Sequence, residues 1–179
     1  MALNYRKISL AQGVILSVAG LFVGIVALLV APLSSILGIR ILVLLLAWFC
    51  FWFFSHDLVH HLVGRTVGIE FQYYFIGRSA IRKLKLPAAS GIMEKIPVLG
   101  LKIDRSSLEK ASPSERRWML RSGAISSMIL PWIVLPTGYT IGPLWVGVLF
   151  TLLTLGNDLF TLYFSPKVGD FSAARAVKG

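Results

Sequence analysis

The chain is poor in residues that carry acid, thiol or imidazole chemistry. Among its 179 residues are 8 acidic residues, one cysteine and three histidines. The single cysteine, Cys50, excludes an intrachain disulfide and any redox motif built on two cysteines. We also expect no cleavable signal peptide, because the first apolar segment is long enough to span a membrane and no small-residue cleavage site follows a short apolar core.

Apolar residues are abundant instead. The chain is 56% hydrophobic and 15% charged, with a mean hydropathy of +0.76, which is more apolar than a soluble domain of this length requires. Its formal net charge is +10, from 18 Lys and Arg residues. In a membrane protein such an excess marks cytoplasmic loops that face anionic lipid. The composition therefore predicts a single membrane domain over residues 1–179.

Four segments are long and apolar enough to be membrane spans. They cover residues 11–31, 39–63, 122–136 and 143–164. The third is short, and Pro131 and Pro136 are expected to bend or end it. Between the second and third spans, residues 65–121 form a polar, basic segment, which we expect to be a loop. The pattern predicts an all-α polytopic membrane protein with about four transmembrane helices.

Basic residues flank the spans mainly on one side: Arg6 and Lys7 before the first, residues 65–121 after the second, and Lys167, Arg175 and Lys178 after the fourth. The connections on the other side contain only Arg40. This asymmetry predicts that both termini and the basic loop are cytoplasmic, as in an integral protein of a prokaryotic cytoplasmic membrane.

The basic loop is expected to lie on the membrane surface and to contact lipids, and it is not expected to bind nucleic acid. Its later part has few aromatic residues beyond Trp118 and no nucleic-acid-binding motif. The stretch SSLEKASPSERRWMLR (106–121) predicts a surface helix that is capped by Ser112 or Ser114.

All three histidines lie in HDLVHH, residues 56–61, inside the second apolar segment. On a helix His56 and His60 share a face, at the spacing with which two imidazoles of an HExxH helix bind one tetrahedral metal. Asp57 takes the place of the glutamate that activates the attacking water in such sites. His61 lies about 100° around the helix from His60 and is not expected to bind the same metal. Because ionisable groups at this depth are costly, the cluster predicts a metal site rather than polar packing.

A third protein ligand must be an acid near the fourth span. Asp158 lies within that span, and Asp170 follows it. If the second and fourth spans start at a common surface near Ile39 and Pro143, a rise of about 1.5 Å per residue places Asp158 closer in depth to the histidines. We also expect Pro166 to end the helix before Asp170. Depth thus favours Asp158, with Asp170 as the alternative.

The segment HDLVHHLVGRTVGIEFQYYFIG resembles the active-site segment of the site-2 protease family of intramembrane zinc metalloproteases. His56 and His60 match the family's zinc-binding histidines, and Gly68 matches the glycine that ends the helix. SPSERRWMLRSGAISSMIL resembles the family's span of small residues, with Ala124 in place of a proline. GNDLFTLYFSPKVGD resembles the last motif, which carries an asparagine and the aspartate ligand.

This resemblance implies a Zn²⁺ cofactor, Asp57 as the catalytic base, and a transmembrane helix as substrate. It also implies a small membrane-associated β element after the second span, formed by IEFQYYFIG. Such a strand would pair with the substrate by edge addition, with Phe71, Tyr73 and Phe75 as substrate-binding residues. Anchoring of the strand at the lipid headgroups is the alternative.

Two other functions compete with the protease reading. Asp57 is one methylene shorter than the family's glutamate, and this change favours a catalytically inactive relative that acts as a metal-binding or structural subunit of a membrane complex. HDxxHH is also similar to a histidine box of membrane di-iron desaturases. Those enzymes carry many histidines in several boxes, so three histidines in one place exclude that class.

Overall fold

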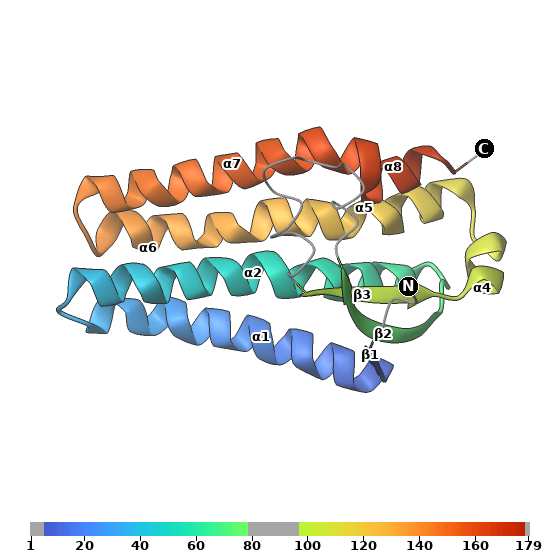
Figure 1. Ribbon diagram of the computed structural model, residues 1–179, viewed down its shortest axis with the longest axis horizontal. Helices are drawn as coiled ribbons and strands as arrows, with labels where there is room; N and C mark the ends of the chain where they lie inside the picture. The colour runs from blue at the N-terminus through green and yellow to red at the C-terminus, as the bar shows by residue number, and fades with distance from the viewer. Residues whose placement is uncertain (1–5, 79–96, 178–179) are drawn as a thin grey trace.

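The computed structural model describes residues 6–78 and 97–177, and Figure 1 shows their arrangement. In chain order the elements are β1 (Arg6–Ile8), α1 (Leu10–Val30), η1 (Ala31–Leu33), α2 (Leu37–Thr66), β2 (Phe71–Arg78), β3 (Pro97–Ile103), α4 (Arg105–Lys110), α5 (Pro113–Ile129), η3 (Leu130–Ile133), α6 (Val134–Thr140), α7 (Leu144–Val168) and α8 (Asp170–Arg175). The basic residues Arg82, Lys83, Lys85 and Lys95 lie outside the described residues.

Four helical stretches are long and apolar enough to cross a membrane. They are Leu10–Leu33, Leu37–Thr66, Pro113–Thr140 and Leu144–Val168. The predicted fold class, with four helices of spanning length and a small β element, is confirmed. In Figure 1 the four stretches run roughly alongside one another, and α2 packs against α1 on one side and α5 on the other.

The glycines of α1 permit its close contact with α2. A Cβ atom on Gly20 would collide with the ring of Phe54, and one on Gly24 would lie 2.9 Å from Cβ of Cys50. Both glycines are buried. Small residues let two membrane helices approach closely, so the spacing of Gly20 and Gly24 serves packing within one chain.

The third span is longer than the sequence predicts. Ser112 caps α5 through a capping box with Glu115, and Pro113 occupies the first turn. The first part of the predicted surface helix forms the separate helix α4, whereas the part from Pro113 onward is continuous with the 122–136 span. Pro131 changes the helix to a 3₁₀ turn without ending the span, and Pro136 lies within α6.

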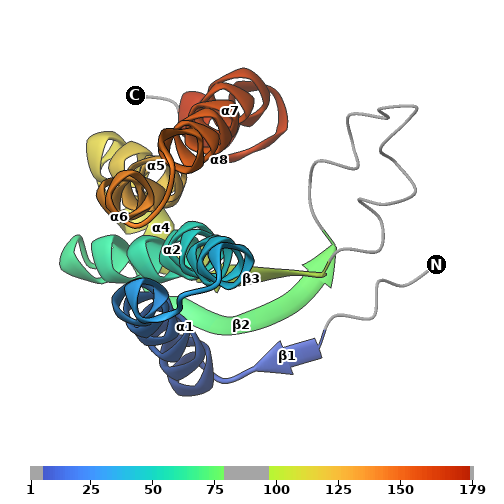
Figure 2. The same cartoon turned by 90° about the vertical axis from the view of Figure 1, so that its left-hand side faces the viewer.

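A three-stranded antiparallel sheet occupies part of the segment predicted to be a loop. Strand β2 is central: β3 pairs with it from Phe71 to Arg78, and β1 pairs with Tyr74–Ile76 on its other side. Gly68, with φ of 76°, reverses the chain between α2 and the sheet, as its match to a helix-ending glycine predicts. Figure 2 shows the sheet passing beside α1 and α2.

Two apolar clusters lie at different positions along the helices. The first joins α1, α2, α6 and α7 and contains Ala27, Ala31, Leu44, Ala47, Phe51, Val134, Leu135, Val146 and Phe150. The second joins α2, the sheet and α5 around Ile69, Phe71, Ala111 and Met119. The histidines of α2 lie near the second cluster.

Candidate metal centre

His56 and His60 lie on one face of α2, as their spacing predicts, and this face is directed toward α5. Their rings lie 4.9 Å apart between centroids and nearly perpendicular to each other. Gly123 of α5 makes this arrangement possible, because a Cβ atom there would collide with the His60 ring and lie 2.8 Å from the carbonyl oxygen of His56. The absence of a side chain at Gly123 brings the backbone of α5 up to both imidazoles.

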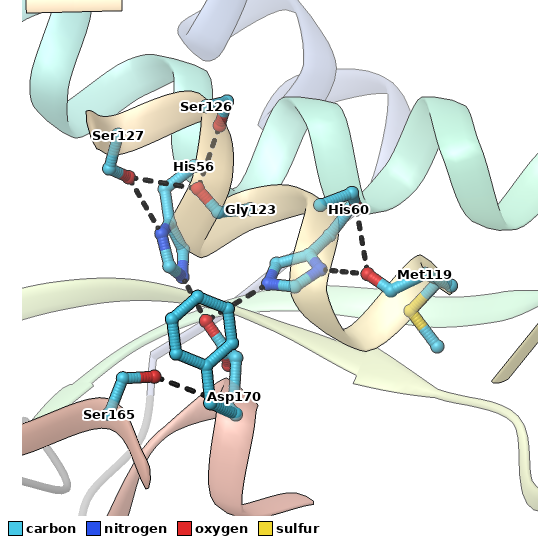
Figure 3. A network of polar contacts seen from close by, with 10 residues as sticks. His56, His60, Met119, Gly123, Ser126, Ser127, Ser165 and Asp170 are labelled. Atoms are coloured by element: carbon cyan, nitrogen blue, oxygen red, sulfur yellow. Dashed lines mark hydrogen bonds and ion pairs between the residues drawn. The ribbon is translucent and has the colours of Figure 1, made fainter. Parts of the chain in front are cut away.

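Residues of α5 fix which nitrogen of each imidazole is protonated. His60 Nδ1 lies 2.7 Å from the Met119 carbonyl oxygen, which only accepts, so His60 Nδ1 is the donor. His56 Nδ1 lies 2.9 Å from Ser127 Oγ, and the Ser127 hydroxyl donates its proton to the Gly123 carbonyl oxygen at 3.0 Å. Ser127 Oγ therefore accepts from His56 Nδ1. In both neutral imidazoles the lone pair is on Nε2, the atom that faces the site in Figure 3.

Asp170 completes the group from the far end of the chain. Helix α7 runs through Pro166 to Val168, and a tight turn at Gly169 leads into α8. A Cβ atom on Gly169 would lie 2.9 Å from Ser165 Oγ, and this hydroxyl also accepts a hydrogen bond from the Phe171 N–H at 3.1 Å. This turn directs the Asp170 side chain toward the histidines (Figure 3).

The two distances from Asp170 to the histidines match those between ligands of a tetrahedral metal ion. Asp170 Oδ2 lies 3.2 Å from His56 Nε2 and 3.4 Å from His60 Nε2. Zinc bonds of about 2.0–2.1 Å at tetrahedral angles place neighbouring ligand atoms about 3.3–3.4 Å apart. All three ligand atoms lie within 4.8 Å of one another, so His56, His60 and Asp170 form a group that could hold a metal ion.

The charge of the group also suits a cation. Burial raises the pKa of the Asp170 carboxyl, but His56 and His60 lower it well below its ordinary value when their Nε2 atoms carry protons and donate to this carboxylate. Asp170 is therefore ionised at neutral pH. Two Nε2 lone pairs that face a carboxylate repel it unless a proton or a metal ion lies between them.

The preference for Asp158 as third ligand is corrected. Asp158 Oδ2 instead accepts a hydrogen bond from Trp132 Nε1 at 3.0 Å. Because α2 starts at Leu37 and α7 at Leu144, His60 lies about 35 Å along its helix, whereas Asp158 lies only about 21 Å along α7 and the end of α7 at Val168 lies about 36 Å along it. The depth of His60 therefore matches the end of α7, just before Asp170, and not Asp158.

Pro166 also does not end α7, contrary to the prediction. It lies in the last turn, where its missing N–H costs only the hydrogen bond to the Leu162 carbonyl. Asp170 consequently starts α8 directly after α7 and reaches the histidines.

Asp57 lines a cavity beside the metal-binding group. The cavity has a volume of about 170 Å³ and is lined by His56, Asp57, His60, Phe71, Leu101, Ile103, Met119, Leu120 and Asp170. Asp57 is buried. The lining thus combines acids and imidazoles with apolar side chains of the sheet and α5.

The predicted substrate strand is the central strand of the sheet. Strand β2 pairs with β3 along its length and with β1 over Tyr74–Ile76, so it has no open edge over those three residues, and substrate pairing at β2 stays a prediction. Phe71 lines the cavity, whereas Tyr73 lies under Lys7 with 4.7 Å between the Lys7 nitrogen and the ring centroid. Phe75 packs near Gly100.

His61 lies apart from the other two histidines, as its angular position predicts. Its ring packs 5.2 Å from the Phe71 ring and 6.1 Å from the Tyr74 ring, between centroids. In the sequence, Ser127 was only one letter of the small-residue motif SPSERRWMLRSGAISSMIL, and nothing there pointed to Met119. The Met119 contact uses a backbone carbonyl, which carries no side-chain signal.

Comparison with models of known protein families gives no match, and comparisons with curated proteins and with solved structures give none either. The resemblance to site-2 proteases therefore stays a prediction that rests on the sequence motifs.

Proposed function

We propose that this chain is an intramembrane zinc metalloprotease-like protein that hydrolyses peptide bonds in or near transmembrane helices. The observation that carries this proposal is the convergence of His56 Nε2, His60 Nε2 and Asp170 Oδ2, with Asp57 on the wall of the same cavity. Two imidazoles and one carboxylate are a donor set of catalytic zinc sites, which keep one position open.

When bound, zinc would act as a Lewis acid and would lower the pKa of a water in its open position. The His56 and His60 side chains, held by α5, would hold the zinc together with Asp170 through their Nε2 lone pairs. Asp57 accepts a proton from the attacking water and returns a proton to the amide nitrogen as the C–N bond breaks, which yields a carboxylic acid and an amine.

Strand β3 is the element we propose for binding the substrate backbone. Leu101 and Ile103 of β3 line the cavity, and among the described residues only β2 pairs with this strand. A locally unwound segment of a transmembrane helix would add to β3 as a further strand and place its peptide bond at the cavity.

We infer that the sheet and both termini are cytoplasmic. Arg6 and Lys7 of β1 and the basic first turns of α5 lie at one end of the spans, whereas Arg40 lies at the opposite end, where its guanidinium donates to the Ser34 and Ile141 carbonyl oxygens. Positive residues favour the cytoplasmic side, and a prokaryotic cytoplasmic membrane suits this topology.

The alternative is a catalytically inactive relative that binds metal or supports a membrane complex. The specific observation in its favour is Asp57, whose carboxylate lies one methylene closer to α2 than a glutamate would. An acid that falls short of the attacking water would leave metal binding intact and abolish hydrolysis.

The test is cleavage by the purified full-length chain in lipid nanodiscs. The probes are single-span model helices that carry a central Asn-Pro pair to loosen the helix. We expect cleavage that a zinc chelator stops and that Asp57→Asn abolishes with its zinc content unchanged. If zinc-loaded wild type and Asp57→Glu both leave every probe intact, the protease proposal fails and the alternative is supported.

A further inference from the structure

Two polar residues in the middle of α7, Asn157 and Asp158, have no part in the metal centre. Polar and charged groups within a membrane span are costly and need a compensating role. Their contacts reach η3 and α5. Asp158 Oδ2 accepts from Trp132 Nε1 at 3.0 Å, and Asp158 Oδ1 accepts from Asn157 Nδ2 at 3.3 Å.

The Asn157 amide is oriented by these contacts. Its Nδ2 also donates to the backbone carbonyl oxygen of Ser127 at 3.1 Å. Both neighbours are acceptors, so the nitrogen and not the oxygen of the Asn157 amide faces them. The two N–H groups of one side chain thereby connect Asp158 on α7 with Ser127 on α5.

The backbone carbonyl of Ser127 lacks its usual hydrogen-bond donor within the helix. In an α-helix it would accept from the N–H four residues later, which belongs to Pro131 and does not exist. Asn157 supplies the missing donor from the neighbouring helix. Asn157 thus holds the backbone of Ser127, and the Ser127 hydroxyl accepts a hydrogen bond from His56 Nδ1.

We propose that Asn157 is a positioning residue for the metal centre, acting through Ser127 on His56. This inference rests on the proposed metal site. Asp158 and Trp132 hold the Asn157 amide, Asn157 holds the Ser127 backbone where Pro131 interrupts the helix, and Ser127 holds the His56 ring with Nε2 toward Asp170. His60 needs no such chain, since its Nδ1 partner is the Met119 backbone.

Helix α7 also offers a matched control. Thr154, one turn before Asn157, accepts a hydrogen bond from Trp48 Nε1 of α2 at 3.0 Å, so it too links α7 to another helix. Thr154→Val removes this link without touching Ser127 or a histidine. A general loosening of α7 would affect the two variants alike, whereas a positioning role affects only Asn157.

The experiment measures the zinc dissociation constant of the full-length chain in detergent, by competition with a chromophoric chelator. We expect Asn157→Leu to weaken zinc binding by up to about tenfold, the low end for loss of an outer partner of a metal ligand. Thr154→Val should bind as wild type does. In a Ser127→Ala background, Asn157→Leu should add no further loss, because its effect passes through Ser127.

Additive losses in the double variant, or equal losses in Asn157→Leu and Thr154→Val, would overturn the inference. If Asn157→Leu does not fold, Asn157→Asp replaces it. This variant keeps the shape of the side chain but presents an acceptor to the Ser127 carbonyl, so we expect the same loss of zinc affinity. The Co²⁺ absorption bands give a second readout: they should shift in Asn157→Leu and not in Thr154→Val. A wild type that binds no zinc refutes the proposed function itself, whereas zinc-binding wild type with unaffected Asn157 variants refutes only this inference.

Discussion

Helix α2 meets a glycine-bearing helix on each of two faces, and the two contacts do different things. On the face toward α1, Gly20 and Gly24 approach Phe54 and Cys50, and the result is apolar packing. On the face toward α5, Gly123 approaches His60 and the backbone at His56. There the close approach brings hydrogen-bond acceptors within reach of both imidazoles. The same small residue serves packing or ligand orientation, according to what lies opposite it.

The largest expected difference between the two faces is between Gly123→Ala and Gly20→Ala. The added methyl group at Gly123 displaces the His60 ring, and we expect zinc binding about a hundredfold weaker, the high end for a disturbed metal ligand. The methyl group at Gly20 meets the Phe54 ring and should reduce the free energy of unfolding by about 1–3 kcal/mol, as overpacking does.

Zinc competition and thermal unfolding in detergent micelles separate these effects. Gly20→Ala should retain wild-type zinc affinity with a lower midpoint of unfolding. Wild-type affinity in Gly123→Ala would show that the close approach of α5 is irrelevant to the site.

A smaller effect is expected within the α5 face, between two neighbouring serines. Ser126 and Ser127 are both buried, and both hydroxyls donate to the Gly123 carbonyl oxygen. Only Ser127 also accepts from a histidine. Ser127→Ala should therefore weaken zinc binding by at least about tenfold, and Ser126→Ala should leave it unchanged. Zinc titration of both variants checks this. Equal zinc affinities in the two variants would show that Ser127 does not orient His56 for metal binding.

The smallest effect concerns Asp104, which caps α4 away from the metal centre. Hydrogen bonds from the Ser106 hydroxyl, the Ser107 N–H and Gln72 lower the pKa of Asp104. Because the folded pKa is lower than the unfolded one, this stabilisation is present at neutral pH and is lost as the pH falls through the folded value. We expect Asp104→Ala to be slightly less stable at pH 7 and equal to wild type at strongly acidic pH, with zinc affinity at pH 7 unchanged. Unfolding curves of both proteins measured across pH check this expectation. A difference in stability between wild type and Asp104→Ala that grows as the pH falls would contradict it.

Local sequence patterns predicted much of this molecule. Apolar length located the four spans, the i, i+4 spacing of His56 and His60 placed both imidazoles on one helix face, and Gly68 marked the turn into the strand. Each of these features is set by residues close together in the chain. The separation of His61 from the pair followed from helix geometry alone.

The rest depended on contacts between distant segments. Choosing Asp170 over Asp158 required the true starts of α2 and α7 and the continuation of α7 past Pro166. The partner of His60 is the backbone of Met119, which no side-chain pattern reveals. The central position of β2 depended on its pairing with β1 and β3, and this moved the proposed substrate edge to β3.

The most direct test of the central claim is the zinc content of the full-length chain, purified without chelators and measured by elemental mass spectrometry. We compare wild type with His56→Ala, His60→Ala, Asp170→Asn and Asp158→Asn. The structure-based account predicts about one zinc per chain in wild type and in Asp158→Asn, and loss of zinc in the other three variants. Zinc-free wild type, or zinc lost in Asp158→Asn and retained in Asp170→Asn, would contradict it.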